Sequence, residues 1–173
     1  AVFRQPEPWA LLTVDSATTL AFLGLLQLDD NGLPSAHPSN LKNLKFVRGI
    51  DAAGQYLWLR EKYKNLVALS HLGVDTDRRL ADRYPQFDII IGGHSHTLLE
   101  NPVEQNGVMI AQTGANLKYA GKLTLKIQNG SVISRKGEVI PFSALKKEDE
   151  EIRRLIDQYN NNKEFARVVG TAA

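Results

Sequence analysis

Cysteine is absent from this 173-residue sequence, which excludes a disulfide framework, a thiolate zinc site and a cysteine nucleophile. An excess of one charge is also lacking, since 21 lysines and arginines stand against 19 aspartates and glutamates without a basic block. A nucleic acid polymer is therefore not an expected partner. Long apolar runs are missing too: residues 20–26 are far short of a bilayer span and residues 1–14 lack a signal-peptide pattern, so we expect no membrane span.

What is present is the composition of an ordinary globular protein, with 43% hydrophobic and 23% charged residues. Up to residue 93, apolar β-prone runs alternate with segments of helical spacing. The expected elements are a hairpin (10–14 and 19–25), a long loop (27–43), helices at 49–64 and 74–84, and strands at 66–71 and 87–93. The order helix, strand, helix, strand is typical of a parallel α/β layer.

Two Asn-Gly pairs, Asn106-Gly107 and Asn129-Gly130, lie between β-prone runs farther along, and Asn-Gly is a strong hairpin signal. We therefore expect the sheet to continue antiparallel after the last histidine. Residues 147–162 predict a helix, because acidic residues open it and apolar residues follow at helical spacing. The apolar positions are Ile152, Leu155, Ile156 and Tyr159. The tail from Lys163 is expected to be frayed or to act as a linker.

Three of the four histidines follow predicted buried strands: His71 ends the run VALSH, and His94 and His96 follow IIIGG. Ligands of parallel strands lie beyond their carboxyl ends, so neighbouring strands would bring these imidazoles to one edge of the sheet. In extended backbone, residues i and i+2 point the same way, about 6.5 to 7 Å apart. Because converging neutral imidazoles suit zinc, manganese or iron better than magnesium or calcium, the sequence predicts a metal site.

Other interpretations of the histidines stay open at this point. His71 alone would more often be a hydrogen-bonded core or turn residue, and the later pair would cap backbone groups in a turn. His37, between alanine and proline in a polar loop, is expected at the surface. Two other metal hydrolase patterns fit poorly: HxHxDH needs an aspartate where Leu98 stands, and HxH barrels need further histidines, whereas none follows His96.

The segment VALSHLGVDTDRRLADRYPQFDIIIGGHSHT, residues 67–97, resembles the second half of the metallophosphoesterase domain of 5'-nucleotidases and 2',3'-cyclic phosphodiesterases. Its specific part is SHLG followed about twenty residues later by GGHSHT. The resemblance implies an α/β fold of mixed β-sheets flanked by helices, half of a four-layer sandwich. Residues 1–142 would be the carboxyl-terminal portion of that domain, and residues 143–173 a helix and linker.

The resemblance also implies two divalent metal ions, zinc, manganese or iron, with His71 and His94 on one ion and His96 on the other. The family's other ligands come from a DxH motif, a bridging aspartate and a GNH motif that includes the catalytic histidine. This sequence has no DxH and no Asn-His pair, so no catalytic residue is assigned in it. Carboxylates must still offset the four positive charges of two ions. Asp75 and Asp77 do not fill that need, because we interpret them as capping residues of the helix that they open.

The expected function is thus that of a phosphoric ester hydrolase acting on a phosphate ester or nucleotide in the periplasm or outside the cell. We expect the chain alone to be inactive. Its expected partner is the missing N-terminal half of the domain, or a second copy of itself. The alternative is a non-catalytic fragment or pseudo-enzyme that serves as an interaction or structural unit.

Overall fold

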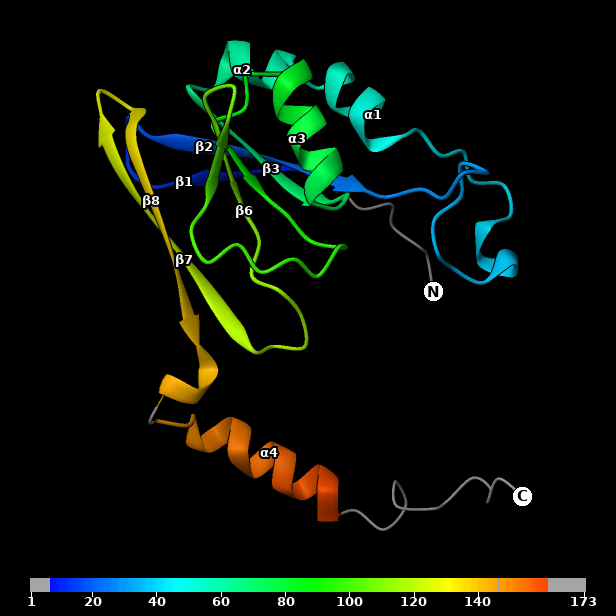
Figure 1. Cartoon of the computed structure of the whole chain (residues 1–173), viewed down its shortest axis with the longest axis vertical. Coiled ribbons are helices and arrows are strands. Elements are labelled where there is room, and N and C mark those ends of the chain that lie inside the picture. Colours follow the sequence, from blue (N-terminus) through cyan, green and yellow to red (C-terminus); the bar gives the residue numbers. More distant parts are fainter. Residues whose placement is uncertain (1–6, 146, 162–173) are drawn as a thin grey trace. The chain divides into compact units, whose positions relative to one another are not determined.

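The computed structural model describes residues 7–145 and 147–161 (Figure 1). The chain divides into two compact units, residues 1–140 and 141–173, which are described separately below. The elements of the first unit are β1 (Trp9–Thr13), β2 (Thr19–Leu26), η1 (Pro38–Leu41), α1 (Gly49–Gln55), α2 (Trp58–Lys62), β3 (Asn65–His71), α3 (Val74–Arg83), β4 (Ile89–Ile91), β5 (Val103–Gln105), β6 (Val108–Ala111), β7 (Tyr119–Gln128) and β8 (Ser131–Pro141). η2 (Phe142–Ala144) and α4 (Glu150–Asn161) follow.

Six strands form one mixed sheet in the order β1-β2-β3-β4-β6-β5. The central strands β2, β3, β4 and β6 are parallel, and β1 and β5 are antiparallel edge strands. The expected α/β class and the three predicted hairpins are confirmed. The expectation that the sheet continues antiparallel is confirmed for the pairing of β5 with β6 and is wrong for β6, which runs parallel to β4. Strands β7 and β8 pair as a separate two-stranded sheet.

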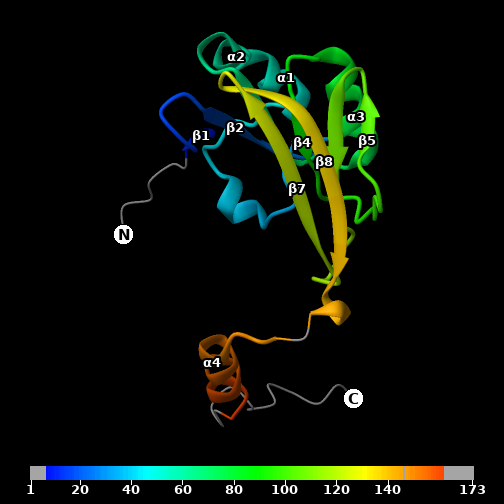
Figure 2. The ribbon, with the colours of Figure 1, turned by 90° about the vertical axis from the view of Figure 1, so that its left-hand side faces the viewer.

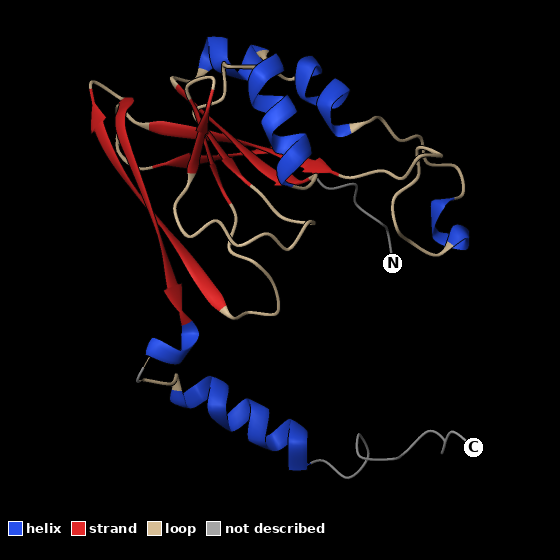
Figure 3. Cartoon of the chain, viewed as in Figure 1, coloured by secondary structure: helices blue, strands red, loops and turns tan. Residues whose placement is uncertain are grey.

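Helices α1, α2 and α3 cover one face of the six-stranded sheet (Figure 3). The core on this side joins strand residues such as Leu23, Ala68 and Ile90 to the helical residues Leu59 and Leu80. Parallel strands covered by helices are rich in apolar residues for this reason, as the runs LVALS and FDIII are.

The single helix predicted over residues 49–64 is wrong, because the structure divides it into α1 and α2 at Tyr56. Ala53 and Leu59 are both fully buried. On an uninterrupted helix, side chains six residues apart point about 120° away from each other. The break at Tyr56, where φ is −110° and ψ is 10°, lets both side chains reach the core.

The β7–β8 hairpin covers part of the opposite face of the sheet (Figure 2). Leu123 and Leu125 pack against Val67 and Ile89 there. The buried Asn65 side chain secures the tip of the hairpin: its amide donates to the carbonyl oxygens of Thr19 (3.1 Å) and Gly130 (2.8 Å), and its oxygen accepts from the Val132 N–H (2.8 Å).

Beyond the hairpin this second face stays open. Leu12, Leu26 and Leu69 are 53%, 53% and 54% exposed, and strand alternation together with the register of β1, β2 and β3 places them on one face. An apolar sheet face of this kind is normally covered by another layer.

In the second unit, α4 begins after Asp149, whose carboxylate accepts hydrogen bonds from the N–H groups of Glu151 and Ile152, both at 3.0 Å. The predicted helix is therefore present, although its apolar positions Ile152, Leu155 and Ile156 are about half exposed. The tail from Lys163 lies outside the described residues. Within the described ranges, no helix has the length and apolar character needed to cross a bilayer.

Candidate metal centre

His71 is the last residue of β3 and pairs in register with Leu26 of β2. Its side chain is exposed on the open face of the sheet, whereas the preceding Ser70 is buried on the helix side. Its carbonyl oxygen accepts from the Gln27 N–H at 3.1 Å, which fixes the end of the strand. The strand thus delivers this imidazole to the carboxyl edge of the sheet, as predicted.

His94 lies beside His71, with 5.2 Å between the ring centroids and 69° between the ring planes. Gly93, directly before His94, makes this approach possible. A Cβ atom on Gly93 would lie 3.1 Å from His71 Nδ1 and 3.4 Å from the Ser70 carbonyl oxygen. A side chain at residue 93 would therefore crowd the nitrogen of the neighbouring imidazole.

His96 does not join these two histidines in a common cluster. In residues 7–145 and 147–161, no three histidine, aspartate or glutamate side chains gather closely enough to hold one ion. The assumption of extended backbone around residue 95 is wrong, because β4 ends at Ile91 and both His94 (φ 75°) and His96 (φ 56°) are left-handed. The structure therefore brings two of the three predicted ligands together. His37 is exposed, as expected, and its ring accepts a hydrogen bond from the Ser39 N–H.

Ser95 and Gln112 hold the loop that contains His94 and His96, and neither role was predicted from the sequence. Ser95 Oγ accepts from the N–H of Val74, the first residue of α3, at 3.2 Å. The buried Gln112 amide lies beneath the loop, with one terminal atom 3.1 Å from the His96 N and 3.2 Å from the Thr97 N. That atom is therefore the amide oxygen, which accepts from both backbone N–H groups. A polar residue directly after the apolar strand β6 was the available sequence signal.

Asp77 is not a capping residue, so that interpretation is wrong. The helix α3 has no side-chain cap, and Asp77 is fully buried, with Oδ1 accepting from Ser70 Oγ at 2.5 Å. Its Oδ2 has no hydrogen-bond partner in the described part of the chain and lies against Gly92, where a Cβ atom would be only 2.5 Å away. Burial raises the pKa of Asp77 to about 6, and the Ser70 hydrogen bond partly opposes that shift. Asp75, by contrast, is exposed.

A groove of about 510 Å³ opens beside the two facing imidazoles. Its lining joins His71 and His94 to residues 26–29 at the end of β2 and to residues 34–36 of the long loop. Asp29 is the carboxylate of this lining, and it accepts from the Leu33 N–H at 2.9 Å, so it supports the loop. The groove therefore presents imidazole nitrogens with little negative charge.

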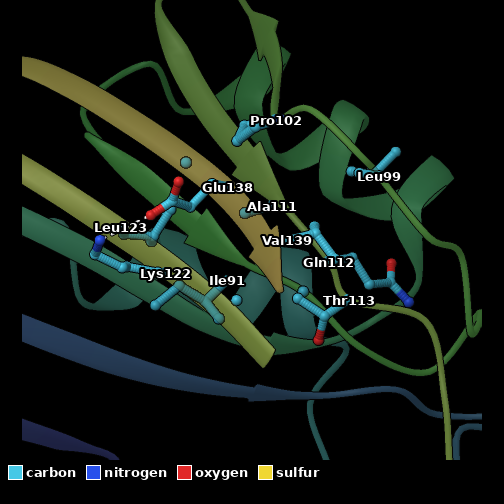
Figure 4. Close-up of a pocket in the computed structure, with 13 residues that line it drawn as sticks. Ile91, Leu99, Pro102, Ala111, Gln112, Thr113, Lys122, Leu123, Glu138 and Val139 are labelled. Carbon is cyan, nitrogen blue, oxygen red and sulfur yellow. Dashed lines mark hydrogen bonds and ion pairs between the residues drawn. The ribbon is translucent and has the colours of Figure 1, made fainter. Parts of the chain in front are cut away.

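A second cavity, of about 250 Å³, lies between the sheet and the β7–β8 hairpin (Figure 4). Ile91 and Gln112 line it from the side of the sheet, and Leu123 lines it from the hairpin. The Lys122 ammonium and the Glu138 carboxylate form an ion pair at 2.8 Å on its hairpin side. Their hydrogen bond lowers the pKa of Glu138 and raises that of Lys122. This cavity contains none of the predicted ligands.

A family model described as calcineurin-like phosphoesterase matches residues 3–98, more than half of the chain and the part that contains all three predicted ligands. The chain belongs to the calcineurin-like phosphoesterase family. The resemblance drawn from SHLG and GGHSHT is thereby confirmed.

Relatives of this chain are named as enzymes that act on nucleotides. It is 27% identical over 164 residues to the trifunctional nucleotide phosphoesterase protein YfkN of Bacillus subtilis, covering 91% of this chain and 11% of that protein. It is 31% identical over 93 residues to a 5'-nucleotidase of Diplobatis ommata, covering 43% of this chain and 16% of that protein. The chain therefore spans less than a fifth of either relative.

Solved structures show the same fold. The chain matches the sulfate thiohydrolase SoxB of Thermus thermophilus with a TM-score of 0.76 and 22% identity, over 94% of this chain and 31% of that one. A 5'-nucleotidase precursor from the same organism matches with a TM-score of 0.73 and 22% identity, over 92% of this chain and 35% of that one. The expected fold of mixed sheets flanked by helices is confirmed, and the chain corresponds to about a third of each structure.

Proposed function

We propose that this chain is part of a phosphoric ester hydrolase that depends on two divalent metal ions and acts on nucleotides, as a 5'-nucleotidase or a 2',3'-cyclic phosphodiesterase. The single observation that carries the proposal is the pairing of His71 and His94 at the carboxyl edge of a phosphoesterase sheet, 5.2 Å apart by ring centroids. The names of the relatives support the nucleotide substrate. The family resemblance supports a periplasmic or extracellular location.

The donor set fits a transition-metal ion in part. Two exposed imidazoles lie side by side in the lining of an open groove, and neutral imidazole nitrogen is a preferred ligand of zinc, manganese and iron. His71 and His94 would hold one ion and His96 the other. Such a pair of ions supplies Lewis-acid activation of water and stabilisation of charge on the phosphate oxygens. Zinc, manganese and iron all remain candidates.

The remaining ligands must include carboxylates, because three neutral imidazoles offset none of the charge of two divalent ions. The buried Asp77 faces Gly92 and Ser70, not the groove, so it does not meet that need. We therefore propose that a polypeptide with the DxH and GNH motifs completes the centre and covers the open sheet face. This chain contributes the imidazoles and the loop that orients them, and the proton for the leaving alcohol comes from the partner's histidine.

Reconstitution tests this division of labour. The chain would be mixed with the amino-terminal half of the domain, taken from the same reading frame or from a relative, and hydrolysis of AMP and of a 2',3'-cyclic nucleotide measured with manganese or zinc. We expect no activity from the chain alone and activity from the mixture, with a loss of at least about 100-fold in His94→Ala. His37→Ala is the matched control and should retain full activity. A mixture that stays inactive contradicts the proposal.

Metal uptake separates the hydrolase from the alternative function, a non-catalytic interaction or structural unit. Zinc or manganese would be titrated calorimetrically into the wild-type chain and into a His94→Ala, His96→Ala double variant. Weak saturable uptake that the double variant loses supports the hydrolase. Equal, negligible uptake by both proteins supports an interaction or structural role.

A further inference from the structure

A polar cavity of about 240 Å³ lies where the start of α1 meets α3 and the segment that follows β2. Its lining includes Arg48, Arg79 and Arg83, together with Asp51 and Thr76. Since a water molecule occupies about 30 Å³ in the liquid, the cavity has room for a small hydrated anion. None of the three predicted metal ligands lines it.

The lining carries an excess of positive charge, because it includes three arginines and one aspartate. Arg83 uses that carboxylate, at 3.2 Å from Asp51 Oδ1. Arg48 donates to the Asp30 carbonyl oxygen at 3.3 Å, and Arg79 donates to Thr76 Oγ1 at 2.9 Å. Neither of these two arginines has a carboxylate partner among the residues that the structure describes.

The chemistry of these groups selects a class of ligand. A guanidinium group stays charged at all physiological pH values and carries five N–H donors in a fixed fork that matches a tetrahedral oxyanion. One neutral partner leaves most donors of Arg48 and of Arg79 available. Arginines that only cover a solvated surface need not line a cavity. Here Arg48, from a loop about thirty residues before the two arginines of α3, lines the same cavity as they do.

We propose that this cavity is a phosphate-binding site, formed mainly by Arg48 and Arg79, that takes inorganic phosphate or the terminal phosphate of an organic ester. The net charge of +2 in the lining, from three arginines and one aspartate, matches a phosphate dianion. The site is separate from the histidine groove, with which it shares only residues 27 and 28 of its lining. It does not depend on the proposed hydrolase function.

A titration followed by NMR tests the site on the full 173-residue chain. Inorganic phosphate would be added at constant ionic strength, with EDTA present so that no metal ion bridges phosphate to the histidines. We expect saturable shifts of the Gly49 and Thr76 backbone amides and of the Arg Nε–H signals. Phenyl phosphate is the second ligand: binding of both favours an ester-accepting site, and binding of inorganic phosphate alone favours a site for the free ion.

Variants identify the groups that bind. The double variant Arg48→Ala, Arg79→Ala should bind phosphate at least tenfold more weakly than wild type. The affinity of the corresponding double lysine variant should lie between these two, because lysine keeps the positive charge but lacks the forked N–H donors of the guanidinium group. Arg78→Ala is the control, since Arg78 is on the same helix but donates to Gln105 at 3.3 Å. His71→Ala should bind phosphate as wild type does. Unsaturable shifts, equal loss in Arg78→Ala, or loss in His71→Ala would each overturn the proposal.

Discussion

The Asp77 carboxyl occupies a position where its negative charge is costly. It is fully buried, one oxygen accepts from Ser70 and the other faces Gly92 without a donor in the described part of the chain. Desolvation therefore raises its pKa from 3.8 to about 6. A carboxyl whose folded-state pKa lies above its unfolded value favours folding while it is protonated, and that contribution is present below about pH 4 and lost as the pH rises through about 6.

The Asp77→Asn variant should remove this pH dependence. The difference between the two pKa values corresponds to about 3 kcal/mol of unfolding free energy between about pH 4 and pH 7.5. The free energy of unfolding of the variant, relative to that of wild type, should therefore rise across that window. Urea unfolding at a series of pH values measures it. Asp75→Asn, a change at an exposed position two residues earlier, serves as the control. Its unfolding free energy should vary with pH as that of wild type does. Parallel curves for Asp77→Asn as well would contradict the prediction.

At the scale of elements, the strands and helices could be predicted, because each has a local periodic pattern of apolar residues. The junctions between these elements could not be predicted. The split between α1 and α2 depends on the need to bury both Ala53 and Leu59, which no local pattern expresses. No local pattern indicates the path of the loop after β4 either. The end of the predicted strand indicated that His94 would lie at the edge of the sheet. It could not indicate the left-handed backbone at His94 and His96, or that the His96 N–H is bound by Gln112, a residue that follows another strand.

Replacement of Gln112 should loosen the loop between β4 and β5 without unfolding the sheet. Its buried oxygen accepts from two loop N–H groups, and Gln112→Ala leaves both without an acceptor. A buried polar group without a partner costs about 1 to 3 kcal/mol of stability. We expect faster amide hydrogen exchange at His96 and Thr97, and weaker metal uptake at the histidines, with exchange in β3 unchanged. Gln105→Ala is the matched control, because Gln105 contacts Arg78 and Asp82 instead of the loop. Unchanged exchange at His96 would refute this role of Gln112.

At the scale of the whole molecule, the open sheet face decides how the chain behaves in solution. Leu12, Leu26 and Leu69 leave more than half of their surfaces exposed on one face, and β1 ends the sheet as an edge strand. Exposed apolar side chains on a sheet face that ends in an edge strand favour association with another polypeptide. The chain should therefore self-associate when alone and become a defined complex when the completing half of the domain is present.

Sedimentation velocity and light scattering across a range of concentrations measure this association. Leu26→Lys with Leu69→Lys should shift the chain toward monomer, because two charges on the open face oppose its burial against a second copy. Ile133→Lys is the control: Ile133 is 59% exposed but belongs to the β7–β8 hairpin, not to strands β2 and β3. The same double variant should also lose binding to the completing half, which ties self-association and reconstitution to one surface. A wild-type chain that is monomeric and stable at all concentrations would show that this face needs no cover.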